Sequence, residues 1–366
     1  MAGQAHGDRY TLFADDRAAE RITMNRSNVD VVRVRQRHSP TLAAAAGHSR
    51  SVSDMLRFTA AVRRARPDGF FVPSVYTYFP LPVGMPAVVT VHDAIAERYP
   101  KLTLPNWRAR WFWRAKVRLA LWQARLVLTV SHYAARDVEN ILRVPADRIR
   151  VTNEASSSVY RPSESAEAVA AAARTIGLPP DATWYTYVGG LNPHKRVDAL
   201  VRAHGEVVRH ANGAKPHLIL VGPTDRDVFH SGADAVVRAI EEAETREYVH
   251  CVGFLPDETL RHLHSGALSL VLPSACEGFG LPAIEAAACG TPVVATTESP
   301  LPELLAGGGI FVSPDDHRGL VDALRTMATD GRRRADMGRT ARKRSQLLSW
   351  DKSATVAIDA LRQVAA

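Results

Sequence analysis

The chain has 366 residues, of which 46% are hydrophobic and 23% are charged, and its formal net charge is +8. These values are typical of a globular protein, and the length predicts two domains of ordinary size. No apolar run approaches the roughly 20 residues that a membrane-spanning helix needs, and the first residues lack the apolar stretch of a signal peptide. We therefore expect a cytoplasmic location. The positive charge suits nucleic acid, an anionic membrane or a phosphate-bearing substrate. No nucleic-acid-binding motif is present, so we do not expect nucleic acid as a partner.

The three cysteines, Cys251, Cys276 and Cys289, are odd in number and lack CxxC spacing. This pattern argues against a disulfide framework and against a zinc site, and it fits a reduced compartment. Cys276 lies beside Glu277, but no His–Asn pairing that would activate a thiol nucleophile is evident.

In the first half, short β-branched runs alternate with helical patterns, which predicts an open and mostly parallel α/β sheet. We expect strands at 11–16, 29–35, 70–75, 87–93, 125–131 and 148–154. Ligands gather at the carboxyl ends of such strands, where His92 follows the run at 87–93. His92 is therefore either a substrate contact or a structural histidine. Tyr76, Tyr78 and Phe79 follow the run at 70–75. They either line the side of a binding site that receives a second substrate, the acceptor, or pack under a loop.

Two segments concentrate the basic residues. Residues 106–125 contain four tryptophans among arginines, and residues 332–344 contain an arginine run. Basic residues mixed with tryptophan can lie at a membrane interface. The alternative, which we favour for both segments, is a packed helix whose aromatic side chains face inward and whose arginines face solvent.

The second half begins with residues 156–180, whose serine, proline and alanine content predicts a connection between domains. A strand at 184–190 ends at Gly189-Gly190, and a helix is predicted from about His194. Lys195 and Arg196 would then lie in its first turn, where cations oppose the helix dipole. Their placement there indicates a bound anion; two cations facing solvent are the alternative.

The run Ala267–Thr297 reads as strand, loop, helix, turn and strand, with Pro282 at the first helical turn. The N–H groups of Phe279, Gly280 and Leu281 precede this helix, where a phosphate finds donors and a favourable dipole. Two nearby carboxylates, on Glu277 and Glu285, suit sugar hydroxyls. Together these groups predict a sugar-nucleotide site. The alternative is that Glu285 complements the helix dipole and Glu277 is a solvated loop acid.

The run CEGFGLPAIEAAACGTPVVATTESPLPEL (276–304) resembles the signature of the retaining glycosyltransferases of family 4, which have the GT-B fold. YVGGLNPHKRVDALVRAH (187–204) resembles that family's phosphate-binding strand-to-helix junction. Weaker likenesses lie at 88–100 and 128–155. The resemblance covers the chain from about residue 70 to 350.

The resemblance implies two Rossmann-like domains that face each other across a cleft, with a last helix that crosses back to the first domain. We expect an acceptor-side domain at 1–155, a linker at 156–180, a nucleotide-sugar domain at 181–345 and the crossing helix at 346–366. The family's opening strand, Gly-rich loop and helix are not found before residue 11. We therefore expect the chain to lack that unit.

Residue by residue, the resemblance implies that Glu285 holds the ribose diol and Glu277 the hexose hydroxyls. Lys195, with the amides of Phe279 to Leu281, stabilises the departing diphosphate, and His92 lies near the donor sugar. The remaining expected donor contacts are Gly189, Gly190, His194, Arg196, Gly253 and Phe254. Phe254 as a core residue is the alternative to its place in a base pocket.

The implied reaction moves a hexose, often mannose in this family, from a nucleoside diphosphate sugar to an acceptor hydroxyl with retention. The product belongs to polysaccharide or glycolipid biosynthesis. We expect no metal and no cofactor, since Lys195 and the helix supply positive charge. The expected partners are the sugar nucleotide, a saccharide or lipid-linked acceptor and the inner face of a membrane. The main alternative is a non-catalytic, truncated or partner-dependent family member; a phosphorylase, an epimerase and a nucleic-acid-binding protein are further rivals.

Overall fold

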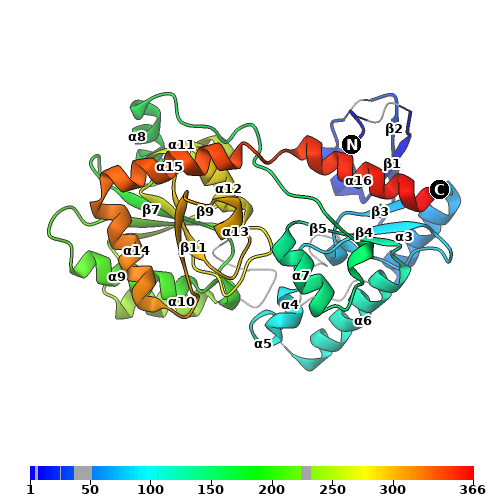
Figure 1. Cartoon of the computed structure of the whole chain (residues 1–366), viewed down its shortest axis with the longest axis horizontal. Helices are drawn as coiled ribbons and strands as arrows, with labels where there is room; N and C mark the ends of the chain where they lie inside the picture. The colour runs from blue at the N-terminus through cyan, green and yellow to red at the C-terminus, as the bar shows by residue number, and fades with distance from the viewer. Residues whose placement is uncertain (5–6, 25, 37–51, 105, 224–231) are drawn as a thin grey trace. The chain divides into compact units, whose positions relative to one another are not determined.

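The structure, a computed structural model, describes residues 1–4, 7–24, 26–36, 52–104, 106–223 and 232–366. These residues form two compact units (Figure 1). The first unit combines Met1–Asn153 with Trp350–Ala366, and the second is Glu154–Ser349. Each unit is built on a parallel sheet with helices, which confirms the predicted α/β class and the two Rossmann-like units. No helix among the described residues is long and apolar enough to cross a membrane.

The first unit contains a two-stranded and a four-stranded sheet, both parallel. The strands, in sheet order, are β1 (Tyr10–Ala14), β2 (Val29–Arg33), then β3 (Phe70–Val72), β4 (Ala87–Thr90), β5 (Leu126–Thr129) and β6 (Ile149–Val151). The helices are α1 (Asp16–Arg21), α3 (Val52–Ala65), α4 (Ile95–Arg98), α5 (Pro100–Thr103), α6 (Trp107–Gln123), α7 (His132–Asn140) and α16 (Trp350–Ala365).

Helices cover both faces of the four-stranded sheet, and both faces are apolar. Val89 belongs to a cluster that includes residues of α3, α6 and α7. Its neighbour Val88 belongs to a second cluster with Ala357 and Val364 of α16. Successive side chains on a strand point to opposite faces, so such strands read as continuous apolar runs. The return of the last helix to the first unit is thus confirmed.

The structure bears on two expectations for the first unit: where Tyr78 and Phe79 lie, and whether a Gly-rich loop follows its first strand. Tyr78 and Phe79 belong to the buried core, at 1% and 7% exposed, so they pack under the loop. The chain passes from β1 into α1 through Asp15, whose side chain accepts a 2.8 Å hydrogen bond from Ala18 N. This N-cap holds the helix start, and the connection contains no glycine.

The second unit has a six-stranded parallel sheet in the order β12-β11-β10-β7-β8-β9. Its strands are β7 (Trp184–Val188), β8 (His217–Val221), β9 (Val249–Gly253), β10 (Ser269–Leu272), β11 (Val293–Thr296) and β12 (Gly309–Val312). Its helices are α8 (Ala166–Thr175), α9 (Val197–Arg209), α10 (Ala233–Glu242), α11 (Asp257–Gly266), α12 (Leu281–Ala288), α13 (Leu301–Leu304), α14 (His317–Thr329) and α15 (Gly331–Ser345). Helices α9, α10 and α14 pack together, and α8 with α11, α12 and α15 forms the other group (Figure 1).

The segment 156–180, expected as a linker, belongs to the second unit. Its alanine-rich part forms α8, which Ser165 caps and which packs against α11. Ala172, Ala173 and Leu178 are buried in that unit's core. The run of small side chains is therefore a close-packed helix surface rather than a flexible tether.

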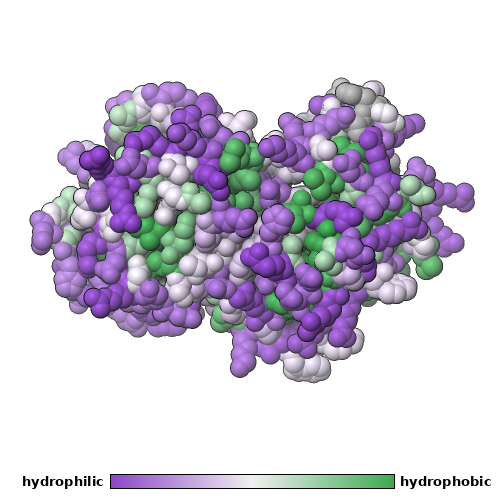
Figure 2. Space-filling view, viewed as in Figure 1, coloured by the Kyte–Doolittle hydropathy of each residue, from purple (hydrophilic) through white to green (hydrophobic). Residues whose placement is uncertain are grey.

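The favoured interpretation of the two basic segments is wrong for α6 and fits α15. The face in view in Figure 2 is largely hydrophilic, as solvent-exposed arginines require. In α15, Gly338 and Ala341 are buried while most arginines are exposed. In α6, however, Trp107, Trp111 and Trp122 are 71%, 68% and 76% exposed. A narrow side of α6, chiefly Val117 and Ala120, packs in the core, so most aromatic side chains of this helix are exposed.

Candidate active site

The candidate site lies where the strand order of the second sheet reverses. From β7 the chain moves to β8 on one side, whereas β10 pairs with β7 on the other. Open α/β sheets bind ligands outside the carboxyl ends of the strands at such a switch point. The loops after β7 and β10 meet there, since Ala275 N donates a 2.7 Å hydrogen bond to His194 O.

Lys195 and Glu277 form the central contact of the site. The Lys195 Nζ atom lies 2.8 Å from Glu277 Oε1 and 3.0 Å from Oε2, and Ser274 Oγ donates a 2.5 Å hydrogen bond to Oε1. Glu277 is only 7% exposed. Burial by itself raises the pKa of this carboxyl, but the Lys195 charge and the hydrogen bonds from Lys195 and Ser274 outweigh it and hold the pKa below its usual range. The site therefore holds an ionised carboxylate against an ammonium group.

The prediction that Lys195 and Arg196 lie in the first turn of a helix is wrong. Pro193–Lys195 form a 3-10 turn, and Arg196 adopts a left-handed conformation with φ 54° before α9 begins at Val197. This break turns the two side chains in different directions. Lys195 reaches Glu277, whereas Arg196 Nη1 pairs with Asp315 Oδ1 at 2.7 Å.

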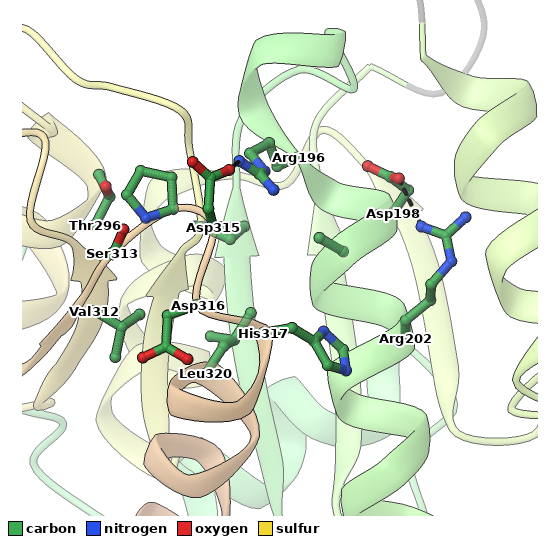
Figure 3. A pocket seen from close by; sticks show the side chains of 13 residues that line it. Arg196, Asp198, Arg202, Thr296, Val312, Ser313, Asp315, Asp316, His317 and Leu320 are labelled. Carbon is green, nitrogen blue, oxygen red and sulfur yellow. Dashed lines mark hydrogen bonds and ion pairs between the residues drawn. The ribbon is translucent and has the colours of Figure 1, made fainter.

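Arg196 lines a separate cavity of about 230 Å³. Figure 3 shows Arg196 and Asp315 pointing toward each other at one edge, with Arg202 paired to Asp198 on α9. The side chain of Arg196 is thus paired with Asp315, whereas the side chain of Lys195 is paired with Glu277.

We expect Arg196→Gly to be more stable than Arg196→Ala by about 1 kcal/mol, because only glycine adopts this φ without a steric cost. Both variants lose the pair with Asp315, so the difference in the free energy of unfolding by urea reports the backbone conformation. Both variants should also keep wild-type nucleotide affinity. A tenfold loss of affinity in both would restore Arg196 to the donor site.

The glycines that follow β7 and β8 let the ends of these two strands approach each other closely. Gly189 has φ 152°, and its N–H donates to Val221 O at 3.0 Å; the Gly190 carbonyl accepts a 2.5 Å hydrogen bond from Tyr187 Oη. A Cβ on Gly222 would lie 2.1 Å from Gly189 O. Close packing of the ends of β7 and β8 therefore accounts for these positions in part.

His194 is mostly buried next to the pair. Burial first, and the charge of Lys195 second, lower its pKa to about 4, so the ring is neutral at pH 7. Among the described residues, its Nδ1 atom is buried without a hydrogen-bond partner. A neutral imidazole at this point could accept or donate a hydrogen bond.

The amino end of α12 supplies backbone donors. Gly280 precedes the helix with φ 84°, and a Cβ there would lie 2.9 Å from Leu301 Cδ1. Within the described residues, the N–H groups of Phe279, Gly280 and Leu281 donate to no protein acceptor. Backbone donors at the amino end of a helix, together with its dipole, favour an anion.

Glu285 lies on α12 in a cluster of acidic groups. Burial, followed by the charges of Asp257 and Glu154, raises its pKa to about 7. Tyr160 Oη donates a 3.1 Å hydrogen bond to Asp257 Oδ1, and burial raises the pKa of that tyrosine well above its usual value. Glu285 lies beyond the first turn of α12, which contains no acidic residue, and a hydroxyl that donates to its carboxyl would favour the ionised form.

Three other predicted residues lie at or just after the ends of two further strands, β9 and β4. Phe254 follows β9 and is 81% exposed, which excludes the alternative that it is a core residue. Gly253, with φ 69°, ends that strand. His92 follows β4 in the first unit, where burial lowers its pKa and the charge of Asp93 opposes the shift. Cys276 is 1% exposed.

Sequence reasoning missed Ser274, Asp257, Tyr160 and Glu154. Ser274 stands three residues before Glu277 in the same loop, so its proximity was readable. Asp257 begins α11 just after the strand end that contains Phe254, which was a weaker signal. Tyr160 comes from the segment interpreted as a linker, and Glu154 ends the strand predicted at 148–154. No group of three or more metal-binding side chains occurs in the described part of the chain.

Two family models match different parts of the chain. The family model "Glycosyltransferase Family 4" matches residues 2–153, and "Glycosyl transferases group 1" matches residues 171–344. The chain is 31% identical over 285 residues to the O-antigen chain mannosyltransferase B of Escherichia coli, which covers 75% of this chain and 70% of the relative. It is also 31% identical over 199 residues to a D-inositol 3-phosphate glycosyltransferase of Kribbella flavida, covering 53% of this chain and 46% of that relative.

Solved structures share the fold at low identity. A sucrose-phosphate synthase from Thermosynechococcus elongatus has a TM-score of 0.75 at 21% identity, covering 99% of this chain and 90% of that one. The Anabaena HepE protein in complex with UDP-glucose has a TM-score of 0.64 at 19% identity, covering 90% and 85%. Signature, family models and a relative matched over most of its length agree, and the chain therefore belongs to the family 4 glycosyltransferases, which have the GT-B fold.

Proposed function

We propose that this glycosyltransferase moves a hexose from a nucleoside diphosphate sugar to an acceptor hydroxyl, with retention of the anomeric configuration. The observation that carries the proposal is the Lys195–Glu277 contact at the strand switch point, close in sequence to the N–H groups at the start of α12, which donate to no acceptor among the described residues. A cation, a carboxylate and amide donors at one sheet edge match the diphosphate and the hydroxyls of such a donor.

In this proposal Lys195 and the amides of Phe279 to Leu281 hold the diphosphate. As the sugar leaves, negative charge grows on the diphosphate oxygen, and fixed donors stabilise it without reorganisation. Glu277 then has two roles: its carboxylate orients the ammonium of Lys195 and accepts hydrogen bonds from the hexose hydroxyls. Ser274 keeps that carboxylate in position.

Glu285 is proposed to accept hydrogen bonds from both ribose hydroxyls. A carboxylate is a double acceptor, and a diol supplies two donors. The exposed ring of Phe254 offers a surface on which the base can stack. Gly253 allows close approach because it has no side chain.

The reaction balances without a covalent enzyme intermediate. The bond between the anomeric carbon and the diphosphate oxygen breaks, and the acceptor oxygen bonds to that carbon from the same face. The acceptor proton passes to the departing diphosphate oxygen. Lys195 and the helix amides supply the charge that a metal would otherwise supply, so we propose that no metal is required.

The class of sugar and product is inferred from relatives. The Escherichia coli relative is named as an O-antigen chain mannosyltransferase, and the Anabaena HepE structure holds UDP-glucose. We propose a neutral hexose donor, with mannose as the first choice, and a saccharide or lipid-linked acceptor in surface polysaccharide or glycolipid synthesis.

A donor screen tests the proposal. We expect GDP-mannose, UDP-glucose or ADP-glucose to bind by calorimetry and to be consumed with a saccharide acceptor in the presence of EDTA. The one-bond ¹³C–¹H coupling at the product's anomeric carbon should indicate the same anomeric configuration as in the donor. Inverted product would contradict retention. Binding without product for any donor and acceptor would instead indicate the non-catalytic alternative, and loss of activity with EDTA would contradict the metal-free reaction.

A further inference from the structure

The outer face of α6 carries three tryptophans that pack on little of the protein. Trp107, Trp111 and Trp122 are 71%, 68% and 76% exposed. The fourth tryptophan of the helix, Trp113, faces inward, where its Nε1 donates a 2.6 Å hydrogen bond to Glu97 Oε1. The orientation of α6 is thus set by Trp113 and the buried Val117, and the other three rings are left on the opposite side.

The three exposed rings lie along one stripe. At 3.6 residues per turn, positions 107, 111 and 122 fall within about 60° of one another around the helix axis. The same face includes Arg114 and Arg118 beside the stripe and Arg108 at its edge, all exposed. Phe112 and Leu119, 43% and 37% exposed, extend the apolar surface.

The charges on this face are all of one sign. The sequence of α6, WRARWFWRAKVRLALWQ, contains five basic residues and no acidic one. Arg108 lies over the ring of Trp107, with Cζ 5.5 Å from the ring centroid. In the described part of the chain, no ion pair or hydrogen bond joins the side chain of Arg114 or Arg118 to another residue, although the charge of Arg114 acts on the Glu97 carboxyl; the Arg118 guanidinium is thus available to an anion.

The exposed apolar area on α6 is larger than that of single hydrophobic residues scattered over a protein surface. A tryptophan carries on the order of 150–250 Å² of surface, so three rings exposed by two thirds or more leave a patch of roughly 300 Å² or larger. The largest apolar patch on a typical monomer measures about 300–600 Å² and is often functional. The basic helix α15 gives a comparison within the same chain, because its exposed residues include arginines but no aromatic side chain.

We propose that the outer face of α6 binds the surface of an anionic lipid bilayer. Tryptophan rings are stable at the level of the lipid headgroups, where one edge is apolar and the indole N–H is hydrated. Guanidinium groups beside them pair with lipid phosphates, and each basic residue near an anionic surface strengthens attachment. The absence of acidic residues on α6 makes the whole face complementary to negative charge.

Vesicle sedimentation tests this proposal on the full chain. We expect the protein to bind vesicles of phosphatidylcholine with 30% phosphatidylglycerol and to bind pure phosphatidylcholine at least tenfold more weakly. Replacing Trp107, Trp111 and Trp122 by alanine should weaken binding at least tenfold. Neutralising three basic residues (Arg108→Gln, Arg114→Gln, Arg118→Gln) should weaken it by a similar or larger factor. Tryptophan fluorescence of the wild type should shift to shorter wavelength on binding.

A matched control separates this face from net charge. Removing three charges from α15 (Arg332→Gln, Arg342→Gln, Lys343→Gln) lowers the net charge equally and should leave vesicle binding within twofold of wild type. All variants should keep wild-type thermal unfolding and nucleotide affinity, since the changed side chains lie outside the core and the donor site. Equal loss in both charge variants would overturn the proposal. So would self-association that the tryptophan variant abolishes, or binding to single-stranded RNA in place of vesicles.

Discussion

Lys195→Met is expected to lower turnover by about 10²–10³-fold, the usual loss when one fixed donor to a developing charge is removed. Methionine keeps the length and apolar stem of the side chain but not its charge. The variant should also lose about 3 kcal/mol in the free energy of unfolding, because the buried Glu277 carboxylate would retain, among the described residues, the hydrogen bond from Ser274 but no cation at hydrogen-bond distance. Turnover at saturating donor and urea unfolding measure the two effects.

The double variant Lys195→Met, Glu277→Gln separates structure from catalysis. Removing both charges of a buried pair is often close to neutral, so we expect the free energy of unfolding to return to within about 1 kcal/mol of wild type. Ser274 can still donate to the amide oxygen. Turnover should stay low, since the cation is still missing. Recovery of turnover together with stability would mean that Lys195 acts only as the structural partner of Glu277.

Glu285→Gln is expected to make the free protein more stable at pH 8 while weakening nucleotide binding. The pKa of Glu285 is raised from 4.5 to about 7 by burial and the nearby charges of Asp257 and Glu154. As pH rises from about 4.5 to 7, the unfolded chain gives up this proton before the folded protein does, so stability falls over that interval. At about 1.4 kcal/mol per pKa unit, the cost above pH 7 reaches about 3 kcal/mol, which the amide avoids.

The nucleotide should respond in the opposite direction. Hydrogen bonds to a charged acceptor contribute about 1.5–3 kcal/mol, so Glu285→Gln should weaken nucleotide binding by roughly 10–100-fold at pH 8. In the wild type, affinity should rise between pH 6 and 8 as Glu285 ionises. Calorimetry and urea unfolding at pH 5 and pH 8 measure both effects. A variant that is less stable at pH 8, or that binds nucleotide as tightly as wild type, would contradict this role.

Glu277 provides the contrast, eight positions earlier in the chain. Its pKa is lowered, so its contribution to stability is present above the ordinary carboxyl pKa and is lost only as pH falls below it. Glu277→Gln should therefore destabilise the protein at pH 8, because Lys195 loses its charged partner. The two acids of one signature motif are thus expected to have opposite effects on stability when neutralised.

Much of the second unit could be predicted because its signals are local. The β10–α12–β11 run has a short apolar strand, a glycine with positive φ, a proline in the first helical turn and a terminating Gly290. Each feature acts within a few residues. The Lys195–Glu277 contact joins positions 82 residues apart and depends on β10 pairing with β7, which the separate patterns do not state. Family resemblance brought these residues together before the geometry did.

The errors also have local causes. The sequence predicts a helical turn at Arg196 because nothing in the residue type indicates a left-handed backbone. The tryptophans of α6 were assigned to the core because aromatic residues usually pack there, and α6 has tryptophan and arginine on the same outer face instead of on opposite ones. The alanine-rich segment that forms α8 resembles a tether in composition but has a helical period.

The path of the chain between its two units has a consequence for synthesis. The last helix, α16, covers the face of the first sheet that includes Val88, Leu126 and Leu128. While the polypeptide emerges from the ribosome, that face lacks the cover of α16 until residues 350–365 are made. The second unit, whose residues all precede α16, can reach its native state before the first unit is finished. The part of the protein that is translated first is therefore completed last.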